Sequence, residues 1–252
     1  MPRVGNLHTQ VVNELGRAIV SGRLAAGTVL PSEAELAAEM GVSRTVAREA
    51  LKSLAARGMV MARPRAGTRI LASDRWSGLD PDIIRWRLTG DDRLERLREL
   101  LELRLLVEPA AAGLTAERAD ADRRQAIWRA FESIAAARED PETWIEAAAE
   151  MHALILGGCG NELLAGIGRL LRAAILESRH VARPALDELP PELAAPHASP
   201  VDEALARYES IAAAIRDGDA GASEREMRGL LQRVAELYDY LIDRAAREGA
   251  PG

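Results

Sequence analysis

Residues 30–60 read LPSEAELAAEMGVSRTVAREALKSLAARGMV. Ser32 and Glu35 stand three residues apart, the spacing at which two side chains cap each other's backbone amides at the start of a helix. Gly41 can end this helix, and Ser43 can cap the next one. Two helices joined by a short glycine-containing turn predict a helix-turn-helix.

The second of these helices has one apolar and one polar face. At about 100° per residue, its valine, alanine and leucine side chains fall on one side. The opposite side carries Arg44, Thr45, Arg48 and Lys52, which can reach guanine edges, phosphates or thymine methyl groups. We count Ser32, at the start of the preceding helix, with them as a DNA-binding candidate. A charged helix face taken alone more often serves solubility, so the flanking sequence must decide.

The flanking sequence completes a larger module. A helix is expected at 7–21, where apolar residues recur at helical spacing, and two short strands are expected within residues 59–71. The turn between the strands contains Arg65 and Gly67. Three helices and a basic hairpin predict a winged helix-turn-helix domain over residues 1–72, with its third helix in the major groove of DNA. Arg65 and the backbone near Gly67 would lie along the minor groove or its phosphates.

The charge is divided unevenly along the chain. The whole sequence has a net charge of -6, but residues 1–73 carry ten basic against five acidic side chains, a formal charge of +5. A basic N-terminal module in an acidic protein is expected of a domain that approaches a phosphate backbone. The acidic remainder of the chain should face another partner.

The rest of the chain predicts a second domain. Residues 73–79 lack periodicity and form the expected linker, and a new element begins at Asp80-Pro81, a good N-cap followed by a good first helical residue. From there we expect only helices, at about 81–89, 92–116, 119–138, 141–157, 161–182, 200–217 and 220–247. The proline-rich stretch from Pro184 to Pro200 is expected to be a loop. The second domain, residues 80–252, is therefore predicted to be an all-α antiparallel bundle, and the fold class mostly α.

Composition and motifs exclude several function classes. No run of about 18 apolar residues exists, and the N-terminus lacks an apolar signal segment. We therefore expect a cytoplasmic protein with no membrane partner. By binding DNA, it would associate with the nucleoid. The single Cys159 excludes an intrachain disulfide and a thiolate zinc cluster. No catalytic nucleophile motif or phosphate-binding loop is present, and Lys52, the one lysine, lies in the N-terminal module. An enzyme is therefore the weaker hypothesis.

The stretch quoted above, followed by a glycine-containing wing, resembles the GntR family of bacterial regulators. The match covers about residues 8–71. By this resemblance, four residues fall on positions that touch DNA: Arg44, Thr45, Arg48 and Gly67. Many members have an arginine where this chain has Ala34, so one contact to DNA is expected to be missing.

The helical half resembles the FCD effector domain of the FadR branch of that family, over about residues 79–245. LDPDIIRWRL at 79–88 and ELRLLVEPAAAGLTAERA at 102–119 are close to its galactonate-responsive repressors. Such domains often hold a divalent metal through one aspartate and three histidines. The matching positions here are Ala148, His152, Tyr208 and Leu230. Because zinc needs at least three protein ligands, we expect no metal cofactor and a metal-independent pocket.

Four side chains are candidates for effector binding: Arg104, His152, Tyr208 and Arg172. Arg104 shares a stripe with leucines, and an arginine inside a bundle must be paired with an anion. That anion is either Glu108, one turn on, or the carboxylate of a bound organic or sugar acid, which the family resemblance favours. His152 and Tyr208 face inward. If they do not bind an effector, they are hydrogen-bonded core residues. Arg172 lies at the edge of the apolar stripe of its helix. If it does not bind an effector, it is an exposed charge in contact with solvent.

The combined prediction is a dimeric repressor. A two-fold homodimer would present two third helices to successive major grooves of double-stranded DNA, so we expect an inverted-repeat operator. The resemblance implies that a small carboxylate or sugar-acid effector releases the repressor from a catabolic operon. Two alternatives remain open at this point: an effector that promotes binding, as for an activator, and a constitutive DNA-binding protein whose large domain only dimerises.

Overall fold

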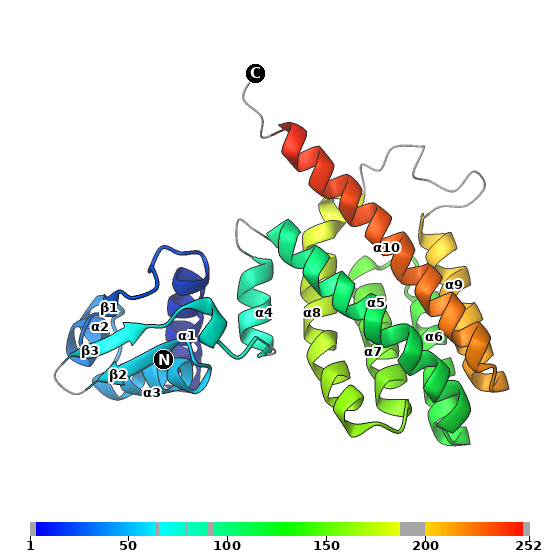
Figure 1. The fold of residues 1–252 in the computed structure, drawn as a ribbon, viewed down its shortest axis with the longest axis horizontal. Coiled ribbons are helices and arrows are strands. Elements are labelled where there is room, and N and C mark those ends of the chain that lie inside the picture. The colour runs from blue at the N-terminus through cyan, green and yellow to red at the C-terminus, as the bar shows by residue number, and fades with distance from the viewer. Residues whose placement is uncertain (1–3, 64–65, 79, 90–92, 187–199, 249–252) are drawn as a thin grey trace. The chain divides into compact units, whose positions relative to one another are not determined.

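The computed structural model describes residues 4–63, 66–78, 80–89, 93–186 and 200–248 (Figure 1). The chain forms two compact units, Met1–Arg93 and Leu94–Gly252. Helices predominate in both, and a small sheet lies in the first. The mostly α fold class is therefore confirmed. None of the described helices has a stretch long and apolar enough to cross a bilayer.

The first unit combines helices with a three-stranded sheet. Its elements are α1 (Val4–Val20), β1 (Val29–Leu30), α2 (Glu33–Glu39), α3 (Arg44–Ala56), β2 (Val60–Arg63), β3 (Gly67–Ile70) and α4 (Pro81–Leu88). The strands are antiparallel in the order β1-β3-β2. Val29 pairs with Arg69, and Val60 pairs with Ile70. The sequence predicted the hairpin β2–β3 but not β1, because two residues are too few to show an alternating pattern.

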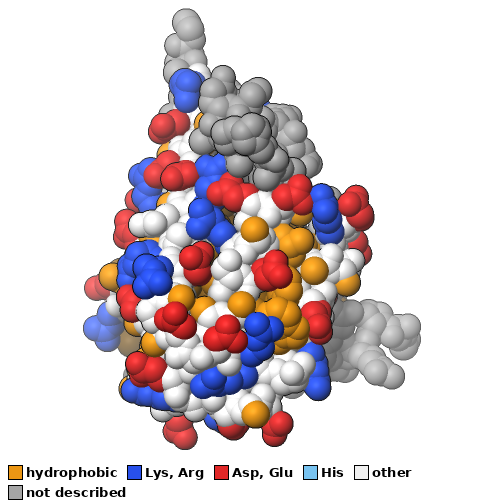
Figure 2. All heavy atoms as spheres, turned by 90° about the vertical axis from the view of Figure 1, so that its right-hand side faces the viewer, with side chains coloured by type: hydrophobic (Ala, Val, Ile, Leu, Met, Phe, Trp, Pro, Cys, Tyr) orange, Lys and Arg blue, Asp and Glu red, His pale blue; other side chains and the backbone are white. Residues whose placement is uncertain are grey.

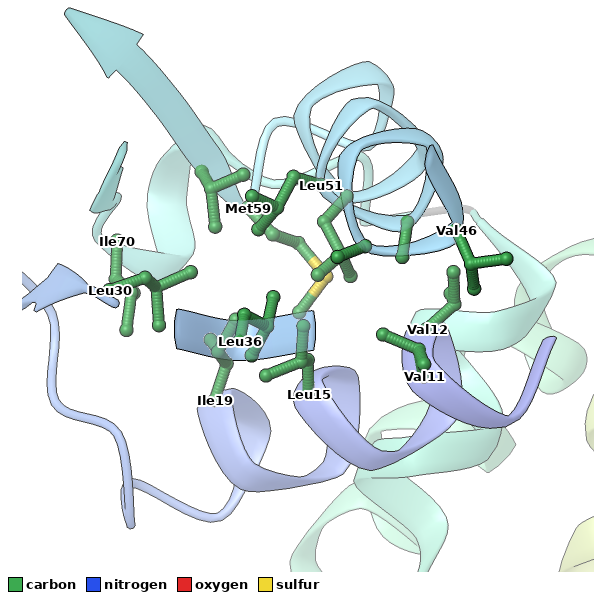
Figure 3. Close-up of a cluster of buried hydrophobic side chains, with 14 of the residues drawn as sticks. Val11, Val12, Leu15, Ile19, Leu30, Leu36, Val46, Leu51, Met59 and Ile70 are labelled. Atoms are coloured by element: carbon green, nitrogen blue, oxygen red, sulfur yellow. The ribbon is translucent and has the colours of Figure 1, made fainter. Parts of the chain in front are cut away.

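The core of this unit lies between α1, α2, α3 and the sheet (Figure 3). From α1 it receives Val11, Val12, Leu15 and Ile19, whose spacing places them on one helical face. From the other elements it receives, among others, Leu30, Leu36, Val46, Leu51, Met59 and Ile70. Burying apolar surface stabilises such a core by about 25 cal/mol per Å². The same burial fixes the rotation of α3, so its polar face turns outward.

Helix α4 packs against α1 within the first unit. Trp86 is buried in the same core, and a Cβ on Gly16 would come within 2.5 Å of the Trp86 ring. Trp86 Nε1 donates a hydrogen bond to Asn13 Oδ1 at 3.0 Å. The sequence placed a linker at 73–79 and assigned α4 to the second domain. The packing of α4 instead extends the first unit, because Trp86 finds its apolar surroundings there.

Polar contacts also tie α4 to the end of α3. Arg57 donates to Asp80 Oδ1 at 3.2 Å, to Asp82 Oδ2 at 2.5 Å and to the Ser53 carbonyl at 3.0 Å. Asp80 in turn caps α4 by accepting from the backbone amides of Asp82 and Ile83. The three charged side chains are between 21% and 29% exposed. Partial burial and two carboxylate partners make this contact stronger than an isolated surface ion pair.

The second unit is a helical bundle. Its described elements are α5 (Arg93–Arg118), α6 (Ala121–Ala136), α7 (Pro141–Gly158), α8 (Glu162–Leu186), α9 (Pro200–Asp217) and α10 (Ala220–Glu248). Short turns join α6 to α7, α7 to α8 and α9 to α10, so these neighbours pack antiparallel. Helix α8 continues through Pro184 to Leu186, where the sequence predicted a loop. The remaining part of that predicted loop, 187–199, lies outside the described residues.

Candidate DNA interface and effector site

Side-chain caps fix the start of α2 and of α3. Ser32 Oγ accepts a hydrogen bond from the Glu35 amide at 3.3 Å, and Glu35 Oε2 accepts one from the Ser32 amide at 2.8 Å. The hydrogen bonds from Ser32 lower the pKa of Glu35. Ser43 Oγ accepts from the Val46 amide at 3.3 Å. The predicted capping box is confirmed, and the Ser32 hydroxyl is engaged in it.

The polar face of α3 points to solvent. Arg44, Thr45, Arg48 and Lys52 are exposed. The opposite face is buried and consists of Val46, Ala47, Ala50, Leu51 and Leu54. This division confirms the predicted orientation of the helix. That these four side chains contact DNA stays a prediction for each of them.

Sequence reasoning missed one member of this face, Glu49. Its side chain is 48% exposed, and its Oε1 lies 3.0 Å from Lys52 Nζ and 3.7 Å from Arg48 Nε. The hydrogen bond and charge of Lys52, together with the charge of Arg48, hold the pKa of Glu49 below its usual value. The three-residue spacing between Glu49 and Lys52 on a helix is the signal that could have revealed the pair.

The wing depends on a glycine. Gly67 has a φ of +78°, in the left-handed region that favours glycine. A Cβ at this position would also meet Val29 Cγ1 at 2.8 Å. Gly67 pairs with Arg63 in the sheet, so both lie on the same exposed face. Arg65, the predicted DNA contact at the tip, lies outside the described residues.

A buried polar network joins three helices of the second unit. Arg104 and Glu108 lie on α5, His152 on α7 and Tyr208 on α9, and each is at most 1% exposed. Arg104 Nε donates to Glu108 Oε1 at 2.6 Å. Glu108 Oε2 lies 2.5 Å from His152 Nδ1, and His152 Nε2 lies 3.3 Å from Arg104 Nη2 and 3.2 Å from the Tyr208 hydroxyl. Three of the four predicted effector residues are thus brought together, with Glu108 as the fourth member.

Arg104 and Glu108 form a charged pair. Burial alone raises the pKa of Glu108, but the charges of Arg104 and His152 outweigh it and lower this pKa to about 2. Burial likewise lowers the pKa of Arg104, and the attraction of Glu108 more than compensates, so the pKa of Arg104 is raised. Within the chain, Glu108 is therefore the anion that pairs with Arg104.

The network does not fit a divalent metal. Ala148 and Leu230, at two positions where the family implies ligands, are buried apolar residues. Arg104 places its guanidinium 3.3 Å from His152 Nε2, so a metal ion on that nitrogen would meet a buried cation. Among the described residues, no group of three His, Cys, Asp or Glu side chains is arranged to hold a metal ion. Metal-independent effector binding stays a prediction.

Arg172 lies apart from the network. Its Nε donates to Glu150 Oε2 at 2.8 Å, and the two side chains are 42% and 48% exposed. Both line a surface pocket of about 480 Å³, together with Arg123 and Arg169. The structure therefore does not bring Arg172 to the other effector candidates. Its position at the edge of an apolar stripe lets the long side chain turn to solvent.

The surface of the second unit carries both signs of charge. Figure 2 shows one face of it, on which acidic and basic side chains alternate around smaller apolar areas. A surface that binds the DNA backbone gathers basic side chains. The described residues of this face show the mixed pattern of an ordinary protein surface instead.

Two family models match the chain. The model described as "Bacterial regulatory proteins, gntR family" matches residues 7–70, and the model described as "FCD domain" matches residues 99–233. The first match covers most of α1, then β1, α2, α3 and the wing, and it ends before α4. The second covers the helices that hold the buried network.

Curated relatives are regulators as well. An uncharacterised HTH-type transcriptional regulator of Escherichia coli is 34% identical over 67% of this chain and 74% of its own length. The galactonate operon transcriptional repressor of Escherichia coli is 33% identical over 63% of this chain and 69% of its own length. The HTH-type transcriptional regulator Mce2R of Mycobacterium tuberculosis is 28% identical over 95% of each chain.

A solved structure shares the fold. It is that of Lar, described as controlling the expression of the Listeria monocytogenes agr system, with a TM-score of 0.62 and 16% identity. The likeness covers 93% of this chain and 97% of that chain.

The matched families and relatives are transcription regulators, and the enzyme hypothesis is thereby excluded.

Proposed function

This chain belongs to the GntR family of bacterial regulatory proteins and carries an FCD domain, and from that premise we propose that it is a homodimeric repressor which a carboxylate effector releases from an inverted-repeat operator. Family membership makes it a ligand-responsive transcription regulator that binds DNA. The dimer, the operator symmetry and the effector class are the proposal. The regulated genes would serve the catabolism of a sugar acid or organic acid, since one relative is a galactonate operon repressor.

The outward face of α3 supports the DNA-binding part of the proposal. Arg44 and Arg48 would present guanidinium groups to guanine edges or phosphates, and Thr45 would contact a phosphate or a thymine methyl group. One recognition helix reads only a few base pairs, so a second copy related by two-fold symmetry would supply the other half-site. A two-fold dimer matches an inverted repeat.

The single observation that carries the effector proposal is the buried guanidinium of Arg104, which is 1% exposed. Arginine binds a carboxylate through two parallel hydrogen bonds, a geometry that lysine does not offer. The effector carboxylate would take the place of Glu108 on Arg104. Because Glu108 also lies against His152, such an exchange would change the contacts between α5 and α7, and effector binding would favour a second arrangement of these helices.

The proposal is tested by thermal shift of the full-length protein with D-galactonate, D-gluconate and L-lactate, each with and without EDTA. A ligand at about 100 times its Kd stabilises the native state by about 2.7 kcal/mol, which raises Tm by several degrees. We expect a shift that survives EDTA, is lost in Arg104→Gln and is kept in Arg172→Gln, a matched control on an exposed arginine. A shift that EDTA abolishes, or that Arg104→Gln retains, contradicts the proposed site.

A constitutive DNA-binding protein is the second candidate, because Arg104 already has an internal anion in Glu108. In that case the network only stabilises the bundle. Titrating a labelled operator duplex with protein, with and without each acid, separates the two candidates. Weaker operator binding with an acid supports the repressor, stronger binding indicates an activator, and unchanged binding across the panel supports the constitutive protein.

A further inference from the structure

Glu49 is an acidic side chain at the edge of a cationic face. It lies about 60° around α3 from Lys52. Its carboxylate is 3.0 Å from Lys52 Nζ and 3.7 Å from Arg48 Nε. Glu49 therefore engages two of the cations that are placed to bind DNA.

A carboxylate at this position weakens binding to every DNA sequence. A phosphate must compete with Glu49 for Lys52 and Arg48, and the two negative charges repel each other. An ionised carboxylate can only accept hydrogen bonds, so it gains energy on DNA only where a base offers a donor. The cost is thus general, whereas any gain depends on the base sequence.

Only one of the four bases presents a major-groove hydrogen-bond pattern that favours a contact with the Glu49 carboxylate. Guanine presents only acceptors there, and thymine presents an acceptor and a methyl group. Adenine presents its N6 donor beside the N7 acceptor, which repels a carboxylate. Cytosine presents the N4 amino donor, the partner that glutamate and aspartate contact.

We infer that Glu49 is a specificity-determining residue that accepts a hydrogen bond from the N4 amino group of a cytosine in each operator half-site. The inference rests on the proposed function, in which α3 occupies the major groove. On other DNA, Glu49 stays paired with Lys52 and Arg48 and opposes phosphate binding. At the operator it turns to the cytosine and releases both cations for phosphate or guanine contacts.

The test is selection of binding sites from a library of DNA duplexes with a randomised centre, using the full-length protein and the variants Glu49→Ala and Glu49→Gln. We expect the wild-type motif to contain a cytosine in each half-site. Glu49→Ala should lose about tenfold of the preference for that cytosine and keep the other positions. Glu49→Gln should shift the position toward adenine, because an amide pairs with adenine N6 and N7.

A matched control removes the same charge elsewhere in the unit. Glu14 is exposed on α1, and Glu14→Gln should select the wild-type motif.

On a mixed-sequence duplex, Glu49→Ala should bind several-fold more tightly than wild type. The slope of its log affinity against log salt should be steeper by about one per protomer, since Lys52 gains a phosphate.

Two outcomes overturn the inference. One is a cytosine preference that both Glu49 variants retain. The other is a preference weakened evenly at all positions, which would assign Glu49 a role in helix stability alone. Arg44→Ala separates this result from a failure of the proposed function. If that variant selects the wild-type motif, α3 does not read the DNA; if it loses the motif while the Glu49 variants keep the cytosine, only the inference about Glu49 fails.

Discussion

Replacing Glu108 by glutamine should destabilise the helical unit by about 3 kcal/mol at neutral pH. The substitution keeps the shape of the side chain but removes the charge that neutralises Arg104. The pKa of Glu108 is lowered from 4.5 to about 2, and at about 1.36 kcal/mol per pH unit this difference corresponds to about 3 kcal/mol. Breaking one side of a buried ion pair costs a similar amount, because the other charge stays buried without its partner.

Guanidinium denaturation of the full chain, followed by far-UV circular dichroism, measures this loss. The matched control is Glu150→Gln, which breaks the ion pair between Glu150 and Arg172 on the exposed surface. Exposed pairs contribute less than about 1 kcal/mol, so the control should unfold close to wild type. The two variants make the same chemical change and differ in burial.

The dependence on pH gives an independent check. The pKa of Glu108 is lower in the folded state than its ordinary value, so its contribution is complete above about pH 4.5 and is lost as the pH falls toward 2. The stability difference between wild type and Glu108→Gln should shrink as the pH falls below about 4.5, because the Glu108 carboxylate then takes up a proton and loses its charge. A difference no larger than that of Glu150→Gln at neutral pH, or one that does not shrink between about pH 4.5 and pH 2, would refute the reasoning.

Two further predictions concern the first unit. Gly16→Ala should destabilise it by about 1–3 kcal/mol, because the added Cβ would lie 2.5 Å from the Trp86 ring. Tryptophan fluorescence during thermal unfolding measures this loss. The control is Gly157→Ala, which should not destabilise the protein because a Cβ there meets nothing within 4 Å. Equal behaviour of the two alanine variants would contradict the packing of α4. Gly67→Ala should lower the affinity for a selected operator several-fold, because its φ of +78° and its contact with Val29 oppose a side chain. Fluorescence anisotropy with a labelled duplex checks this, and unchanged affinity would mean that the wing does not contribute to binding.

The sequence predicted those parts of the fold that local patterns determine. The Ser32–Glu35 capping box and the two faces of α3 follow from spacing within one or two helical turns. The docking of α4 does not, because it depends on Gly16 leaving room for Trp86, and the two residues are far apart in the chain.

The same distinction applies to the candidate sites. The spacing of Arg104 and Glu108 on one helix predicted that they could pair. The approach of His152 to both of them depends on how α7 packs against α5, which no local pattern describes. Arg172 was grouped with them because its stripe is apolar, but its edge position leaves it on the surface with Glu150.

The docking of α4 also determines where a hybrid regulator can be joined. If this DNA-binding unit is to be fused to a different effector domain, the junction belongs after Leu88. A junction at 73–79 would remove the Trp86 ring from Gly16 and both carboxylate partners from Arg57. The transplantable module is therefore one helix longer than the motif by which its family is identified.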